Sequence, residues 1–142
     1  MQKMKNSGFT LLELIVVIII IGVLATFTIP NYSKYFERTR GKYAQNNLLA
    51  IYDKEKRYRL DNNAYYICPS PCTLTKINDP ITGLELDLTD PYFTYTITVR
   101  PGSGYTATAT RNSDSTLCAG KKISIDDTGS GFILTNACQY WK

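Results

Sequence analysis

The longest apolar run of the chain extends from Leu11 to Ile29 and holds a single charged residue, Glu13. A helix that begins at Phe9 and rises about 1.5 Å per residue would cross roughly 30 Å of hydrocarbon by the end of this run. We therefore expect one membrane-spanning helix over residues 9–30.

Helical character continues beyond this segment in an amphipathic form. Gly22 and Pro30 are helix breakers, and they predict a kink or local loosening before the helix resumes over residues 31–61. An apolar stripe on one side predicts packing against a globular part, with the charged side facing water or neighbouring subunits. Its members are Ala44, Leu48, Ile51 and Tyr52. Opposite charges spaced four residues apart, which stabilise a helix surface, occur at Asp53–Arg57 and Glu55–Arg59.

The pattern then changes to alternating positions separated by turn formers. Residues 92–99 and 104–111 alternate around a Pro-Gly-Ser turn, which predicts a β-hairpin. Residues 121–126 and 131–135 read as two further strands around the turn at 127–130. The predicted fold class is α+β, with a long N-terminal helix packed on a small antiparallel sheet.

Length and composition narrow the possible functions. The 142 residues allow one domain plus an anchor, and the net charge of +4 is too small to indicate nucleic-acid binding by field alone. The chain contains no histidine, which excludes Ser-His-Asp triads and histidine-ligated metals. No phosphate-binding glycine-rich loop is present either. We expect no enzyme activity and no cofactor.

The cysteines Cys68, Cys72, Cys118 and Cys138 indicate disulfide bonds in an exported protein, although four cysteines allow three pairings. Counting Lys and Arg on the two sides of the apolar run would instead place the large domain in the cytoplasm. The cysteines lack the paired knuckles of a zinc site. The acidic turn at 126–131 lacks the EF-hand pattern for calcium and reads as a β-turn. No metal site is expected.

Glu13 lies where a charge is costly, because an unpaired carboxylate in hydrocarbon costs on the order of 2 to 3 kcal/mol. If the chain is cut after Gly8, the new α-amine of Phe9 lies one helical turn before this carboxylate and can compensate it. A carboxylate in the first turn also suits the helix dipole. The alternative is a plain membrane anchor whose Glu13 sits at headgroup level.

The motif Gly8-Phe9-Thr10-Leu11-Leu12-Glu13-Leu14 resembles that of type IV pilin and pseudopilin precursors, which carry a class III leader. The resemblance implies that a prepilin peptidase cuts between Gly8 and Phe9 and methylates the Phe9 amine. It further implies that Glu13 faces the Phe9 amine of an adjacent subunit in a filament, and that helical order can be lost between Gly22 and Pro30.

The same resemblance implies four segments: a leader (1–8), a transmembrane and filament-core helix (9–30), its amphipathic second half (31–61), and a β-rich head (62–142). In the head it implies a C-terminal loop closed by Cys118–Cys138, and a second, tight loop is expected at Cys68–Cys72. Expected partners are further copies of the chain in a homopolymer, the inner-membrane prepilin peptidase and pilus assembly machinery, and membrane lipid before assembly. No specific nucleic acid is evident.

The leading functional hypothesis is a structural subunit of a type IV pilus, serving adhesion, motility or DNA uptake. It would be a single-pass inner-membrane protein before assembly and part of a surface pilus afterwards. Glu13, which initiating minor subunits often lack, favours a major subunit. The alternatives are a major-type pseudopilin of a type II secretion system and an anchored domain that never polymerises.

Overall fold

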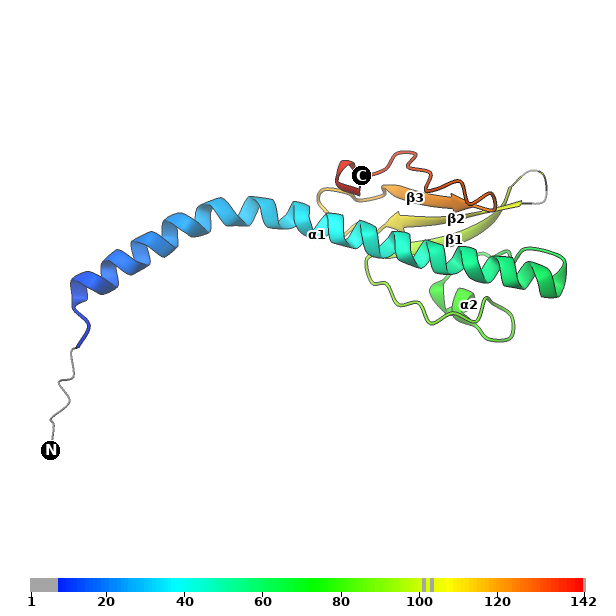
Figure 1. Cartoon of the computed structure of the whole chain (residues 1–142), viewed down its shortest axis with the longest axis horizontal. Coiled ribbons are helices and arrows are strands. Elements are labelled where there is room, and N and C mark those ends of the chain that lie inside the picture. Colours follow the sequence, from blue (N-terminus) through cyan, green and yellow to red (C-terminus); the bar gives the residue numbers. More distant parts are fainter. Residues whose placement is uncertain (1–7, 101, 103, 142) are drawn as a thin grey trace, which may run out of the picture. The chain divides into compact units, whose positions relative to one another are not determined.

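The computed structural model describes residues 8–100, 102 and 104–141, with the side chains of residues 28–31 excepted. Leader residues 1–7 and two of the residues expected in the hairpin turn, 101 and 103, lie outside the described part. The element order is α1 (Leu11–Asn62), α2 (Leu74–Asn78), β1 (Phe93–Arg100), β2 (Gly104–Arg111), β3 (Lys122–Asp126) and a short 3-10 helix, η1 (Gln139–Trp141) (Figure 1). The chain divides into two compact units, residues 1–35 and 36–142.

The long helix expected from the sequence is confirmed as α1, which continues through Gly22 and Pro30. In the first unit its large apolar side chains are exposed on every side, from Leu11 at 76% to Phe27 at 74%. Within the described part of the chain, no single helix is both long and apolar enough to cross a membrane. The segments Leu11–Phe27 and Tyr32–Asn62 meet that test only when they are taken together as a broken pair. A single span over residues 9–30 therefore stays a prediction.

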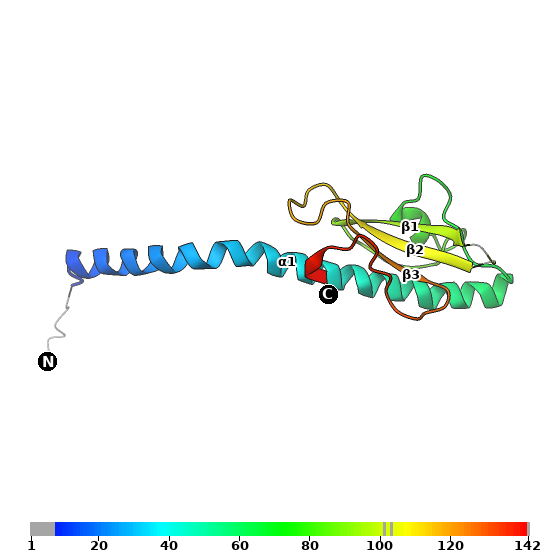
Figure 2. The same cartoon turned by 90° about the horizontal axis from the view of Figure 1, so that it is seen from above.

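The predicted hairpin is confirmed within one residue at each boundary. The three strands form one antiparallel sheet in the order β1-β2-β3, with Ile97 opposite Ala107 and Ala107 opposite Ile125 (Figure 2). Apolar side chains alternate with threonines along β1 and β2, so one face of the sheet is buried.

The prediction of a strand over residues 131–135 is wrong. This segment contributes one isolated bridge, between Ser124 and Ile133. Gly129 and Gly131 adopt positive φ, of 64° and 124°, and such a backbone turns the chain out of the extended conformation that a continuous ladder requires.

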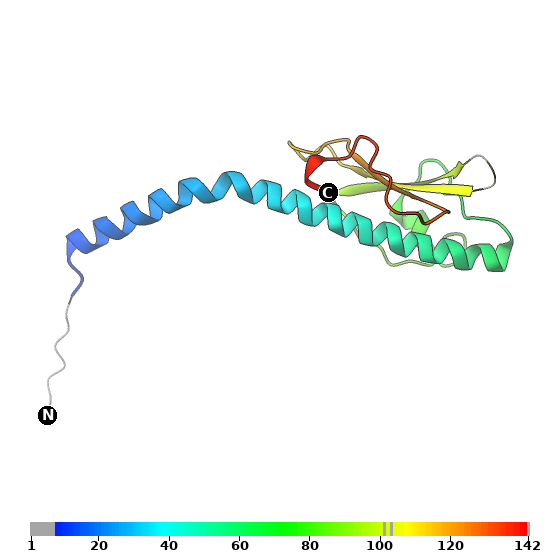
Figure 3. The same cartoon turned by 45° about the horizontal axis from the view of Figure 1, so that its top comes forward.

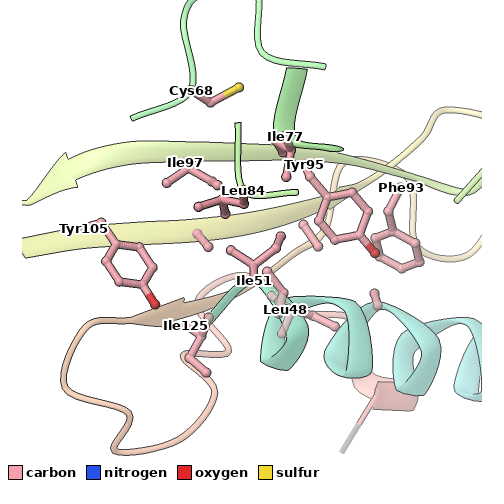
Figure 4. Packing of buried hydrophobic residues seen from close by; sticks show 14 of the residues in the cluster. Leu48, Ile51, Cys68, Ile77, Leu84, Phe93, Tyr95, Ile97, Tyr105 and Ile125 are labelled. Carbon is pink, nitrogen blue, oxygen red and sulfur yellow. The ribbon is translucent and has the colours of Figure 1, made fainter. Parts of the chain in front are cut away.

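The core of residues 36–142 lies between the second half of α1 and the sheet. Figure 4 shows Leu48 and Ile51 of α1 directed toward apolar side chains of the strands, among them Ile97 and Ile125. Ala44, Leu48 and Ile51 are fully buried, so most of the predicted apolar stripe is confirmed, and Tyr52 is half-buried at its margin. The α+β, pilin-like fold class is thereby confirmed.

Two segments that were not predicted as elements complete the head. The connection that contains α2 covers the outer edge of β1, where the Cys68 backbone N–H donates to the Ile97 carbonyl at 3.3 Å. The C-terminal turn η1 ends beside α1 (Figure 3), where a Cβ added to Gly41 would overlap the Trp141 indole. Gly41 is thus a close-approach position that admits the indole to the helix surface.

The expectation of a disulfide-bonded head is confirmed by two disulfide bonds, Cys68–Cys72 and Cys118–Cys138. The second bond links the loop that follows β2 to the segment just before η1, across 20 residues of sequence. Both Cys118 and Cys138 are buried in the core.

Candidate assembly site

The first turn of α1 is closed by a capping box that sequence reasoning missed. The Thr10 hydroxyl accepts the Glu13 backbone N–H at 3.2 Å, and a Glu13 carboxylate oxygen accepts both the Thr10 backbone N–H, at 3.2 Å, and the Thr10 hydroxyl, at 3.1 Å. The signal was present as Thr-x-x-Glu before an apolar run. Glu13 therefore has partners within its own chain, in addition to any that cleavage would create.

Gly8 and Phe9, the expected cleavage residues, precede this cap. Nothing lies within 4 Å of a Cβ added to Gly8, so packing within the described part of the chain does not require glycine there. Phe9 is 82% exposed and stands immediately before the capping residue. An α-amine created at Phe9 would add positive charge at the positive end of the helix dipole, and Glu13 is the carboxylate positioned to offset both.

The helix that follows is apolar on all sides, and its side chains are solvent-exposed. From Leu11 to Phe27 its large side chains are exposed, and Glu13 is its single charge. A helix that is apolar all round is stable only when lipid or other protein surrounds it. This surface is the one that membrane insertion or helix-to-helix assembly would cover.

In the second unit, a buried ion pair joins α1 to the end of β2. Arg111 donates from Nε and Nη2 to the two carboxylate oxygens of Glu37, at 3.2 and 3.0 Å, and Arg40 donates to the same carboxylate at 2.9 Å. Burial raises the pKa of Glu37, but the hydrogen bonds from Arg111 and then Arg40 outweigh it, so this pKa is lowered. The remaining Arg111 nitrogen, Nη1, bonds the Tyr92 carbonyl and Asp114.

A second buried carboxyl on α1 has the opposite balance. Glu55 is fully buried, and one of its oxygens accepts the Tyr66 backbone N–H at 3.0 Å while the other has no hydrogen-bond partner among the described residues. Burial raises its pKa to about 8, against the smaller lowering effect of the Tyr66 hydrogen bond. The predicted Glu55–Arg59 surface pair is wrong, because Arg59 instead donates to the Tyr65 hydroxyl at 2.6 Å.

The sequence carried a signal for both carboxyls. Glu37, Gly41 and Glu55 continue the stripe of Ala44, Leu48 and Ile51 at alternating spacings of four and three residues. Charged residues in register with an apolar stripe are predicted to be buried and therefore to need partners. The partner on β2 is distant in sequence, so only the fold identifies it.

In the acidic turn at residues 126–131, which was considered for calcium, the carboxylates bind other groups of the protein. Arg100 pairs with Asp126 at 2.9 Å and with Asp127 at 3.1 Å. The Thr128 backbone N–H also donates to Asp126, at 3.0 Å. The described residues contain no group of three or more acidic or cysteine side chains that could hold a metal ion.

A capped apolar N-terminal helix that continues into a small disulfide-bonded sheet head defines the class of type IV pilins and pseudopilins. Residues 3–29 match the prokaryotic N-terminal methylation motif. Residues 30–121, more than half of the chain, match the family described as type IV minor pilin ComP, DNA uptake sequence receptor. The chain belongs to this family.

Curated relatives match over less than half of the chain. The chain is 43% identical over 65 residues to type II secretion system core protein G of Aeromonas hydrophila, which is 46% of both chains. It is 41% identical over 61 residues to type IV major pilin protein PilA of Myxococcus xanthus, which is 43% of this chain and 28% of that one. These matches thus span less than half the length of either relative. Both relatives are structural subunits rather than enzymes.

Proposed function

We propose that this chain is a structural subunit of a type IV filament, held in the inner membrane by residues 9–30 and then assembled with further copies. The observation that carries this proposal is the uncovered apolar surface of α1 between Leu11 and Phe27, preceded by the Thr10–Glu13 cap. Assembly would exchange lipid for packing between helices, so the same surface serves both states. Residues 1–8 would be the removed leader. Residues 36–142 would form the exterior of the filament, which is the exposed surface if the filament is a pilus.

In this mechanism, cleavage between Gly8 and Phe9 creates the charge that Glu13 is positioned to receive. The capping box holds the carboxylate against the Thr10 backbone N–H, one residue from Phe9, so little reorganisation is needed for it to accept a methylated Phe9 amine from a neighbouring subunit. The pairing would then set the register between copies, because an unpaired carboxylate among packed apolar helices is costly.

The processing step is tested by mass spectrometry of the membrane-bound chain. We expect a mature chain that begins at N-methylated Phe9. An intact leader, or a cut after Ile29, would contradict the proposal.

The assembly step is tested by Glu13→Gln, with Thr10→Ser as a matched control that keeps the capping hydroxyl. The Gln variant should accumulate in the membrane at normal levels but yield no filaments in the sheared fraction, while the control assembles. Normal filaments from Glu13→Gln would refute the pairing role.

A second candidate is a major-type pseudopilin of a type II secretion system. The 43% identity over 65 residues to core protein G of Aeromonas hydrophila favours it. Deleting the gene and assaying both surface fibres and secreted enzymes separates the two. Loss of fibres with normal secretion supports the pilus subunit, and the reverse result supports the pseudopilin. The family description names a minor pilin, so the copy number in purified filaments tests our expectation of a major subunit.

The family description also raises DNA as a ligand of the assembled filament. Near the end of α1, the Lys56 ammonium lies 4.3 Å from the Tyr52 ring centre and the Arg59 guanidinium 4.8 Å from that of Tyr65. Cations supported by aromatic rings are typical of nucleic-acid surfaces. Gel-shift titration of the full chain in detergent with duplex DNA, compared with Lys56→Gln and Arg59→Gln, tests this role. Unchanged affinity in both variants would exclude this surface.

A further inference from the structure

Two solvent-facing pairs of opposite charge lie on the second unit of the chain. We call Arg38 and Lys42, on α1, the basic pair. We call Glu85 and Asp87, on the connection between α2 and β1, the acidic pair. All four residues are exposed.

The basic pair is the unused part of a cationic stretch. Residues 36–52 contain three basic residues and one acid, Glu37. Glu37 and Arg40 pair with each other at 2.9 Å, which leaves Arg38 and Lys42 facing solvent. Within the described part of the chain, neither has a carboxylate at ion-pair distance, and Lys42 donates only to a nearby glutamine amide oxygen at 3.1 Å.

The acidic pair is the solvent-exposed part of an anionic stretch. Residues 77–99 contain four acids and no lysine or arginine. The Asp79 carboxylate accepts two backbone N–H groups, and Asp90 accepts two backbone N–H groups and a tyrosine hydroxyl. Glu85 and Asp87 remain exposed, two residues apart in a segment without regular secondary structure. Glu85 has one ion-pair partner in its own copy, Lys54 at 3.6 Å, and its side chain stays 73% exposed.

The two pairs are matched in spacing. Residues four apart on a helix are separated by about 6 Å along its axis. Residues two apart in an irregular segment are separated by up to about 7 Å, a range that includes this spacing. Two cations and two carboxylates with such similar spacing can form two ion pairs at once.

The two pairs do not meet within one copy. The segment that carries the acidic pair runs along α1 (Figure 1), from Glu85, 3.6 Å from Lys54, to Thr89, whose carbonyl accepts the Tyr43 hydroxyl at 2.9 Å. The acidic pair thus lies beside the part of α1 between residues 43 and 54. The basic pair is centred near residue 40, roughly 15 Å away along the axis.

We propose that the basic pair of one copy binds the acidic pair of a neighbouring copy, and that this contact joins the heads along the filament. The inference rests on the proposed filament function. Copies anchored in one membrane have parallel helices, so a contact between two different patches is head-to-tail and repeats without closing. The charge complementarity selects the neighbour and its shift along the axis.

The test is charge reversal with rescue, in cells that carry the chain's own assembly machinery. One variant carries Arg38→Glu and Lys42→Glu, a second carries Glu85→Lys and Asp87→Lys, and a third combines all four changes. A matched control reverses two exposed charges elsewhere on the second unit, Asp61→Lys and Lys122→Glu. Sheared filaments are quantified by immunoblot and electron microscopy, and membrane levels of the subunit report folding.

Each single-side reversal should lower filament yield by about tenfold, because each exposed ion pair is weak but recurs at every interface. The combined reversal should restore most of the yield, and the control should match the wild type. Unchanged yield in either reversal overturns the proposal. A loss of filament yield that the combined reversal does not restore also overturns the proposal. If only the reversal of the basic pair lowers the yield, the result overturns the proposal and indicates an anionic lipid or DNA as the partner of that pair.

Two safeguards keep these outcomes separate. If a reversal variant does not accumulate in the membrane, the neutral variants Arg38→Gln with Lys42→Gln and Glu85→Gln with Asp87→Asn replace it, each with an expected loss of about threefold. If the wild type and the control also form no filaments, the proposed function itself fails, and this inference fails with it.

Discussion

Glu55→Gln should change how the stability of the head depends on pH. In the folded chain this carboxyl is fully buried with one oxygen unpartnered, and its pKa is raised from 4.5 to about 8. The folded state therefore binds the proton more tightly than the unfolded state. The stability contributed by the bound proton is fully present below pH 4.5 and is lost as the pH rises toward 8.

The size of the effect follows from proton linkage. Between these two values the free energy of unfolding falls by up to about 1.4 kcal/mol per pH unit. Wild-type protein should therefore lose about 3 kcal/mol between pH 5 and pH 8 through this single group. Glutamine has a similar shape and no charge at any pH, so the variant should match the wild type near pH 5 and exceed its stability by about 3 kcal/mol at pH 8.

Denaturant unfolding of the full chain in detergent measures this directly. Trp141 is the single tryptophan and is buried in the core, so its fluorescence reports on the fold. Asp53→Asn, on the exposed side of the same helix, is the matched control and should keep the wild-type pH profile. If Glu55→Gln keeps the wild-type slope between pH 5 and pH 8, the buried proton is not on Glu55 and the reasoning is refuted.

Three other substitutions test the packing of the head by the same fluorescence assay. Gly41→Ala should destabilise the head by about 1 to 3 kcal/mol, because the new methyl group would overlap the Trp141 indole. Gly22→Ala is the control and should have no such effect, because the space around Gly22 is open. Glu37→Gln should cost about 2 to 3 kcal/mol at neutral pH, because it removes the buried carboxylate that faces Arg111 and leaves the half-exposed Asp114 as the carboxylate paired with that guanidinium. Since the pKa of Glu37 is lowered, wild-type protein should approach the variant as the pH falls through that pKa, and a constant difference would contradict this. Removing the bond between Cys118 and Cys138 should cost about 3 kcal/mol, and an unchanged unfolding midpoint would contradict the loop-closure argument.

The long helix and the hairpin were predictable because their signals are local. Helix-forming residues with a continuous apolar stripe define α1, and alternation around a turn defines β1 and β2 to within one residue. The strand expected over residues 131–135 failed because alternation does not reveal backbone conformation. Gly131, at its first position, and Gly129, in the turn before it, adopt positive φ.

The candidate site was only partly predictable, for the same reason. Glu13 could be singled out because a charge in an apolar run is visible in the sequence, and its partner Thr10 lies three residues away. Glu55 was assigned to a surface pair because i,i+4 spacing describes a helix surface and does not say which side is covered. The sheet covers that side of the helix, so the carboxyl is buried and its pKa rises.

By itself, the sequence determined the class of protein: an apolar helix with one acid after a Gly-Phe junction, a second amphipathic half, and a small head with cysteines. These features depend on residues that are close in the sequence, so periodicity and spacing reveal them. Only the tertiary structure decided which charges are used within the head and which face solvent, because Glu37 meets Arg111 from 74 residues away. Ion pairing depends on distance in space, which the order of residues along the chain does not specify.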